Sequence, residues 1–304
     1  MEIQVLSKAE VKALSLLGQR RADRTPDEVV VEGPKLIQEA LKSGWQLKWL
    51  LLTESFVVSD HGPIFLESLD PGLSEAKWRL ASPAQMDRLT GLSSSPPVWG
   101  VVSRAALQTR QRPSLFDVDS IPVGAVASGP REGKIPPWWL ALDQIQDPGN
   151  LGTMIRIADW YGFKGLLCSH GTVDCFNPKV LQASMGSVFR VPVSYTDLNK
   201  NSLMALTGLQ LDTRVWQGAK RSTVLDSETS WLVGSVLGAE PLDQFVFPAK
   251  GGILVIGNES KGIHQGLQDE CSHLISIPAW GQAESLNASV AAGILAQAIR
   301  QQSE

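Results

Sequence analysis

Three segments of the 304-residue sequence place glycine and polar side chains where a predicted strand ends. The segment DPGNLGTMIR carries Asn150 and Arg156, IGNESKGI carries Glu259, and ESLNAS carries Ser285 and Asn287. In open α/β sheets, ligands bind beyond the carboxyl ends of the strands. A carboxylate at such an edge can accept a hydrogen bond from a hydroxyl, and a glycine lets a ligand approach the backbone closely. The three segments are therefore candidates for one ligand site.

Each of these residues also has a purely structural interpretation. Asn150 can be the N-cap of a helix, and Arg156 can be a solvated residue two turns further on. Glu259 can be a surface glutamate in a tight turn, and either Ser285 or Asn287 can cap the helix that follows. Considered one segment at a time, the residues leave both interpretations open.

Several common kinds of site are excluded by missing motifs. No GxGxxG follows a predicted strand, and neither GxxxxGK[ST] nor GxSxG occurs. The dinucleotide fold, the P-loop and the hydrolase nucleophile elbow therefore lack their signatures. Cys271 and His273 are two residues apart, which suits a strand better than a zinc site, and no CxxC or HxxxH spacing exists. We expect no metal.

Composition limits the compartment and the way partners bind. The net charge is −4, so bulk positive charge does not drive binding to nucleic acid, although a local basic face remains open. Three cysteines are too few for a disulfide framework and indicate a reducing compartment. The start has no signal-peptide core, and the apolar runs are too short to span a membrane. We expect a cytoplasmic protein without a membrane segment.

The C-terminal half alternates strand and helix patterns. The pattern predicts strands at Trp138–Ile145, Gly165–Ser169, Val188–Val193, Gly252–Gly257 and Leu274–Pro278. It predicts helices at Leu151–Tyr161, Pro178–Met185, His264–Cys271 and Ala288–Arg300. Such alternation indicates an α/β fold with a mostly parallel sheet covered on both faces. Residues 212–249 fit this pattern poorly and are interpreted as a possible insertion.

The N-terminal half is typical of a smaller α/β module. A helix is predicted at Lys8–Leu17 with a capping box of Ser7 and Glu10. A second helix follows Gly33-Pro34, and strands are predicted at Val29–Val31, Leu47–Thr53 and 98–103. Proline, glycine and serine punctuate residues 107–137. We therefore expect a domain over residues 1–106, a linker over 107–137 and a second domain over 138–304.

Taken in series, the motifs carry a family resemblance. NLGTMIR, IGNESKGI and IPAWGQAESLNASVAAGI resemble the three motifs of the SpoU (TrmH-type) branch of the SPOUT RNA methyltransferases. The intervening NPKVLQASMGSVFRVPV is similar to the same family, and the match runs from about Trp139 to Ala298 apart from 212–249. VVVEGPKLIQEALKSG near the N-terminus resembles the L30e-like substrate-binding domain that precedes many of these catalytic domains.

The resemblance implies a function, a cofactor and a fold. The reaction would transfer the methyl group of S-adenosylmethionine to a ribose 2′-hydroxyl in ribosomal or transfer RNA. The catalytic domain would form a trefoil knot and work as a homodimer. The catalytic set would be Asn150, Arg156, Glu259, Ser285 and Asn287, and the cofactor positions would be Gly257, Asn258, Ile277 and Leu286.

Two positions depart from the family pattern, and one role stays open. Gln182 stands where the family usually has arginine, and Ala279 where it usually has methionine. The family assigns Arg156 as general base, but a guanidinium stays protonated to beyond about pH 12. Arg156 can equally hold the phosphate beside the target ribose, leaving Glu259 to take the proton or to orient Asn150.

The N-terminal module offers one local basic cluster. Arg20, Arg21 and Arg24 follow the first predicted helix and are candidates for contact with the RNA backbone. Their structural interpretation is a solvated helix end. Two other functions also remain open: a non-catalytic RNA-binding protein on the same scaffold, and a SPOUT enzyme that methylates a base.

Overall fold

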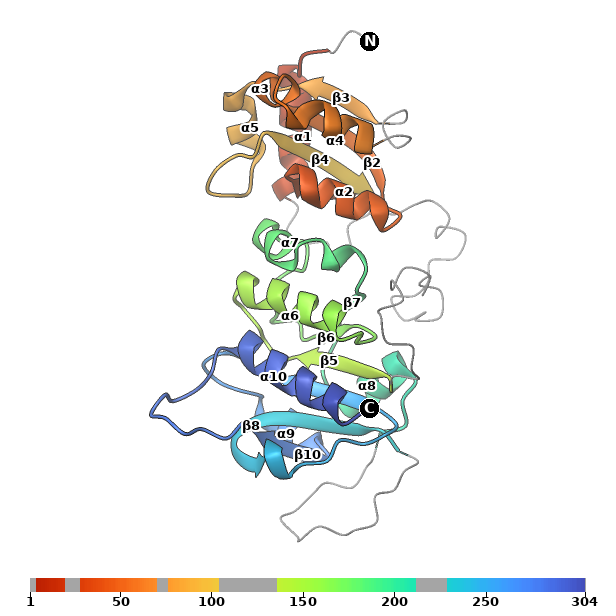
Figure 1. Ribbon diagram of the computed structural model, residues 1–304, viewed down its shortest axis with the longest axis vertical. Coiled ribbons are helices and arrows are strands. Elements are labelled where there is room, and N and C mark those ends of the chain that lie inside the picture. The colour runs from red at the N-terminus through yellow and green to blue at the C-terminus, as the bar shows by residue number, and fades with distance from the viewer. Residues whose placement is uncertain (1–3, 20–27, 70–75, 104–135, 212–228, 304) are drawn as a thin grey trace. The chain divides into compact units, whose positions relative to one another are not determined.

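The computed structural model describes residues 4–19, 28–69, 76–103, 136–211 and 229–303. The chain divides into two compact units, Met1–Arg112 with Asp174–Phe189, and Pro113–Val173 with Arg190–Glu304. Each unit is described by itself (Figure 1). Arg20, Arg21, Arg24 and most of the linker 107–137 lie outside the described residues. The boundaries 1–106, 107–137 and 138–304 stay a prediction.

A four-stranded sheet organises the first unit. Strand β4 (Val98–Ser103) lies between β1 (Glu28–Glu32) and β2 (Gln46–Leu52) and is antiparallel to both, while β3 (Lys77–Leu80) pairs parallel with β2. The helices are α1 (Lys8–Gln19), α2 (Pro34–Lys42), α3 (Glu54–Val57), α4 (His61–Ser68) and α5 (Pro83–Leu89). The predicted helices and strands of this half are confirmed.

The start of α1 forms as its sequence predicts. The Ser7 hydroxyl oxygen accepts from the Glu10 N–H at 3.2 Å, and the Glu10 carboxylate accepts from the Ser7 N–H at 2.9 Å. These reciprocal bonds satisfy N–H groups that a helix start would otherwise leave unpaired. The same device begins α5 at Ser82 and Gln85, a helix that the periodicity alone does not predict.

The segment that follows α7 (Pro178–Ser184) corrects one predicted strand. In place of a strand over Val188–Val193, Ser187–Phe189 is a short 3₁₀ turn, and strand β7 begins only at Val193 and runs to Tyr195. Helix α7 ends at Met185 with a left-handed backbone, φ 52°, followed by Gly186 at φ 93°. This reversal redirects the chain, and Phe189 then packs edge-on against Trp45 with ring centroids 5.3 Å apart. Burial against an aromatic ring, and not sheet pairing, explains this apolar run.

The second unit is built on a parallel sheet. Its strands lie in the order β10 (His273–Ser276), β8 (Trp231–Pro241), β9 (Gly252–Ile256), β5 (Trp138–Leu142), β6 (Leu166–Cys168) and β7, with every neighbouring pair parallel. The predicted α/β class with a parallel sheet is confirmed.

Strand β8 corrects the interpretation of residues 212–249. Trp231–Gly234 pairs in register with Gly252–Val255 of β9, and β10 pairs on its other side. The part of 212–249 that forms β8 is therefore an interior strand of the sheet and not an insertion. Its Gly234, Gly238 and Pro241 weaken the strand pattern. Residues 212–228 lie outside the described residues.

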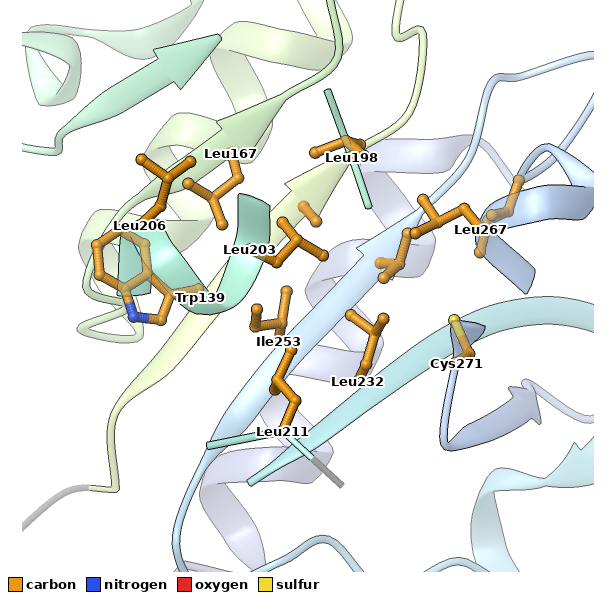
Figure 2. Packing of buried hydrophobic residues seen from close by; sticks show 13 residues of the cluster. Trp139, Leu167, Leu198, Leu203, Leu206, Leu211, Leu232, Ile253, Leu267 and Cys271 are labelled. Carbon is orange, nitrogen blue, oxygen red and sulfur yellow. The ribbon is translucent and has the colours of Figure 1, made fainter. Parts of the chain in front are cut away.

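Helices cover both faces of this sheet. On one face, α8 (Lys200–Thr207) and α9 (Gln265–Glu270) bury Leu203 and Leu267 against Ile253 and its neighbours (Figure 2). On the other face lie α6 (Pro148–Trp160) and α10 (Ala288–Gln301), which pack against one another (Figure 1). Trp138 to Leu142 are buried throughout, as is typical of a strand between two helix layers.

Arg300 fastens α10 to the end of α6. Its guanidinium donates to the carbonyls of Tyr161 at 2.6 Å and Gly162 at 3.0 Å, and it lies over the ring of Phe163. Burial lowers the pKa of Arg300 to about 10, so the group stays charged at neutral pH. A cation at these carbonyls complements the negative end of α6.

Glu32 gives the first unit a predicted dependence on pH. It is 5% exposed and accepts hydrogen bonds from the Thr90 hydroxyl and the Gly91 N–H. Burial raises the pKa of Glu32, and the two hydrogen bonds offset this only in part. The folded chain therefore binds this proton more tightly than the unfolded chain. The free energy of unfolding should fall as pH rises from the ordinary glutamate pKa, about 4.3, through the raised folded value.

Glu32→Gln should remove this component of the pH dependence. Urea unfolding of both proteins between about pH 4 and about pH 7 gives the measurement. Exposed Glu67 is the matched control, and Glu67→Gln should keep the wild-type dependence. A Glu32→Gln curve parallel to the wild type would contradict the prediction.

Two structural findings concern the cysteines and the helices of the chain. Cys168, Cys175 and Cys271 are all buried, and burial raises the pKa of Cys271 to about 12, which keeps that thiol protonated. Among the described residues, no helix is long and apolar enough to cross a membrane.

Candidate active site

The three motif segments leave the same edge of the parallel sheet. Residues 143–150 follow β5, residues 257–264 follow β9, and residues 277–287 follow β10. Strands β5 and β9 are neighbours, and β8 lies between β9 and β10. Because every pair is parallel, the carboxyl ends of these strands meet at one edge.

Asp147, and not Asn150, is the N-cap of α6. The Asp147 carboxylate accepts from the Asn150 N–H at 2.7 Å, and Pro148 occupies the first helical turn. The capping interpretation of Asn150 is therefore wrong. An aspartate directly before proline is a common start of a helix, so the sequence does carry the signal for Asp147. This cap leaves the Asn150 side chain available for other contacts.

Asn287 caps α10 and at the same time points its amide group at Asn150. Its Oδ1 accepts from the Ser289 N–H at 2.9 Å, the Ser289 hydroxyl at 2.7 Å and the Val290 N–H at 3.3 Å. Because those groups donate, Oδ1 is the acceptor and Nδ2 is the donor. Nδ2 donates to Asn150 Oδ1 at 2.9 Å. The capping interpretation is confirmed, and it coexists with a link between segments.

Asn150 continues the series of hydrogen bonds to Glu259. With Oδ1 accepting from Asn287, its Nδ2 donates to Glu259 Oε1 at 2.9 Å. Asn150 is only 8% exposed, so losing either partner would leave a buried polar group unsatisfied. Within the described chain, Glu259 Oε2 makes no hydrogen bond. The structure thus joins one residue from each motif into a single directed chain, Asn287 to Asn150 to Glu259.

The turn between Gly257 and Gly262 holds Glu259 in place. A Cβ atom at Gly257 would overlap the backbone of Gly262 and Ile263, so only glycine fits there. Asn258 exchanges backbone hydrogen bonds with Gly262 at 3.0 and 2.9 Å. Its side-chain oxygen accepts from the N–H groups of Ser260 and Lys261, and its Nδ2 donates to Gln144 O at 2.7 Å. The side chain of Asn258 and its backbone N–H and C=O are therefore all paired inside the protein, and its role as a cofactor position stays a prediction.

Arg156 and Ser285 lie outside the hydrogen-bonded chain. Arg156 is exposed on α6, and six residues make only about 1.7 turns, so its side chain leaves the helix in a different direction from Asn150. Within the described residues it makes no hydrogen bond or ion pair. Ser285 is exposed two residues before Asn287. Both are free to meet a molecule outside the chain.

The loop after β10 exposes both polar backbone and apolar side chains. In the described chain, the backbone groups of residues 279–286 make no hydrogen bond to another backbone group. Ile277 is half-buried and Leu286 is 49% exposed. Ala279 is exposed in the same loop, and Gln182 is exposed on α7. No group of three or more His, Cys, Asp or Glu among the described residues suits a metal ion.

Comparison with known families agrees with this geometry. The model of the SpoU rRNA Methylase family matches residues 137–297, more than half of the chain. The model of the MRM3-like substrate binding domain matches residues 8–92. This chain therefore belongs to the SpoU family of RNA methyltransferases, with a smaller substrate-binding domain at its N-terminus.

Individual relatives match from about three quarters to nearly the whole of the chain. The 23S rRNA (guanosine(2553)-2'-O)-methyltransferase RlmP of Bacillus subtilis is 28% identical, covering 98% of this chain and 99% of the relative. The 23S rRNA (guanosine-2'-O-)-methyltransferase RlmB of Ralstonia nicotianae is 30% identical over 73% of this chain and 77% of its own length. Among solved structures, the SpoU methyltransferase AviRb of Streptomyces viridochromogenes, in complex with AdoMet, has a TM-score of 0.71 and 26% identity, covering 97% of this chain and 98% of that one.

Proposed function

We propose that this chain transfers the methyl group of S-adenosylmethionine to a ribose 2′-hydroxyl of ribosomal RNA. The observation that carries the proposal is the directed chain from Asn287 through Asn150 to Glu259. It joins the three family motifs at one edge of the sheet. The relatives named as 23S rRNA 2'-O-methyltransferases support the choice of ribose and of ribosomal RNA.

The residues after β9 and β10 fit this cofactor. The backbone groups of residues 279–286 offer donors and acceptors to its polar edges. Ile277 and Leu286 offer apolar surface to its adenine ring, and Gly257 keeps a side chain out of the turn. When bound, S-adenosylmethionine supplies a methyl group on a positively charged sulfur.

Glu259 and Arg156 have complementary roles in this proposal. Glu259 Oε1 is held by Asn150, so Oε2 is the oxygen available to accept the proton of the target hydroxyl. Arg156 carries a lasting positive charge and has a planar fork of donors that matches a phosphate. Fixing the hydroxyl in line for attack supplies on the order of 7–11 kcal/mol at best. Ser285 stays a predicted site residue beside Asn287.

We also propose that the catalytic domain forms a trefoil knot and that the protein works in the cytoplasm. We further propose that the chain forms a homodimer. Val290 and Ile294 expose apolar side chains along one side of α10, and Trp160 is exposed at the end of α6. A second copy of the chain would bury this apolar surface. Analytical ultracentrifugation of the whole chain tests the dimer: we expect twice the chain's mass, and a monomer at all concentrations would contradict it.

The substrate class is tested by transfer of a labelled methyl group to purified RNA. The whole chain should label 23S ribosomal RNA and leave transfer RNA unlabelled. Omitting the protein is the control for carry-over of label. Label on transfer RNA alone would overturn the choice of ribosomal RNA but keep the activity.

The basic cluster Arg20, Arg21 and Arg24 is proposed to hold the RNA backbone. Replacing all three by alanine should weaken RNA binding and reduce the log–log salt slope by roughly 0.7 to 0.9 for each phosphate that is no longer neutralised. Turnover at saturating RNA should be preserved, because uniform binding is removed and transition-state stabilisation is not. Filter binding over a salt series measures the slope, and cofactor affinity is the internal control. An unchanged RNA affinity and an unchanged salt slope would show that the three arginines form only a solvated helix end.

A further inference from the structure

A buried carboxylate next to the candidate active site is not used by the chain from Asn287 to Glu259. Asp143 follows β5 and is 2% exposed. One of its oxygens, Oδ2, accepts from the His264 N–H at 2.9 Å and lies 2.7 Å from His264 Nδ1. A buried carboxylate is costly without such partners. Asp143 therefore depends on His264, which lies 121 residues away in the sequence.

This pair is one of three links between the same two segments. Asn258 Nδ2 donates to Gln144 O at 2.7 Å, and Asn150 Nδ2 donates to Glu259 Oε1 at 2.9 Å. Residues 143–150 and 258–264 are thus joined near both ends of each segment. Any shift of one segment against the other must break at least one of these bonds. The position of Glu259 relative to Asn150 is coupled to the contact at His264.

The His264 ring hydrogen-bonds Asp143 and does not cap the helix that it begins. It occupies the N-cap position of α9, yet its side chain makes no capping hydrogen bond. A serine or aspartate would cap this helix better. Because a carboxylate only accepts, Nδ1 must carry the proton that faces Asp143. The other ring nitrogen, Nε2, belongs to a side chain that is 49% exposed.

We propose that His264 is a positioning residue for methyl transfer, acting through Asp143 to keep Glu259 on Asn150. The inference rests on the proposed function, since it concerns the same site. The ring hydrogen-bonds Asp143 and makes no hydrogen bond to Glu259 or Asn150 within the described residues. Its Nδ1–H fixes the turn of residues 257–263, and the turn fixes the Glu259 carboxylate. Misplacing a group by about 1 Å can cost about 100-fold in rate, so removing this one bond should be visible in turnover.

Three substitutions separate the Nδ1 contact from the bulk of the ring. His264→Asn keeps an N–H donor at about the reach of Nδ1, His264→Gln moves the donor outward, and His264→Ala removes it. We expect His264→Ala and His264→Gln to lower kcat by about 10-fold or more, with KM for RNA and cofactor affinity within about twofold. His264→Asn should recover most of the turnover. His61→Ala, an exposed histidine of the first unit, is the matched control and should behave as wild type.

A second readout needs neither RNA nor cofactor. Long-range proton–nitrogen NMR of the wild type should show the His264 ring protonated on Nδ1. Hydrogen exchange should show faster exchange at the Asn258 and Gly262 amides in His264→Ala, but not in His264→Asn. Turnover and exchange are compared well below the lowest melting temperature among the variants, which separates positioning from global stability.

The positioning role and the proposed function fail on different results. Wild-type turnover in His264→Ala, or equal recovery by Gln and Asn, would overturn the positioning role. Unchanged exchange of the 257–263 turn in His264→Ala would overturn it as well. If the wild type transferred no methyl group to RNA, the proposed function would fail, while the NMR and exchange measurements would still decide whether His264 holds the turn.

Discussion

Arg156→Ala should reduce methyl transfer to RNA by at least about 100-fold while leaving cofactor affinity within about twofold. Arg156 is exposed on α6 and meets no partner within the described chain, so its charge is available to a ligand. In the proposed reaction it holds the phosphate beside the target ribose. Without that interaction the hydroxyl is poorly aligned, although the cofactor loops are untouched. Alanine is a strong helix former, so α6 should persist.

The measurement pairs single-turnover methyl transfer with a calorimetric titration of S-adenosylmethionine. Lys164→Ala, which removes another exposed cation of the same unit, should leave both values unchanged. Arg156→Lys should recover only part of the activity, because an ammonium cannot form the bidentate contact. Loss of cofactor binding in a folded Arg156→Ala protein would show that its role has been misassigned.

Asn150→Ala should also lower turnover by at least about 100-fold, for a different reason. The substitution removes the donor to Glu259 and the acceptor for Asn287 at once. The three motif segments then lose their common link, and the Glu259 carboxylate is no longer oriented. A cost of about 1–3 kcal/mol in the free energy of unfolding should accompany the loss of these buried bonds.

Asn150→Asp gives a sharper version of the same test. The aspartate can still accept from Asn287, but it offers no donor to Glu259 and places a second carboxylate beside it. Activity should therefore stay as low as in the alanine variant. Asn199→Ala is the control, because it removes the cap of α8 and costs about 1 kcal/mol away from the site. Turnover of Asn199→Ala at saturating substrate should match the wild type. Near-normal activity in either Asn150 variant would contradict the role given to the hydrogen-bonded chain.

The sequence predicts the α/β class and most elements of the second unit, because strand and helix periods alternate there. The prediction fails where a segment is buried by packing outside the sheet and where glycine and proline interrupt a strand. The Val188–Val193 run is apolar because Phe189 packs on Trp45 after a left-handed turn, and period alone does not show that. Strand β8 escapes prediction because glycines and a proline interrupt an interior strand.

The candidate site is predictable as a set of residues, but its hydrogen bonds are not. The place of the three segments after predicted strands, together with the family resemblance, predicts that Asn150, Glu259 and Asn287 gather at one edge. The direction of the hydrogen bonds depends on Asn287 being held by Ser289 and Val290, which only the folded geometry shows. Asp143 and His264 carry no local pattern at all, since their contact joins segments far apart in the sequence.

The central claim, ribose methylation by the linked motif residues, is tested most directly by nucleoside mass spectrometry of treated RNA. Ribosomal RNA incubated with the whole chain and S-adenosylmethionine is digested to nucleosides and each methylated species is identified. The proposed reaction predicts a 2′-O-methylnucleoside with wild type and none with Asn150→Ala or Arg156→Ala. A methyl group on a base, or no methylation by a protein that binds the cofactor, would contradict it.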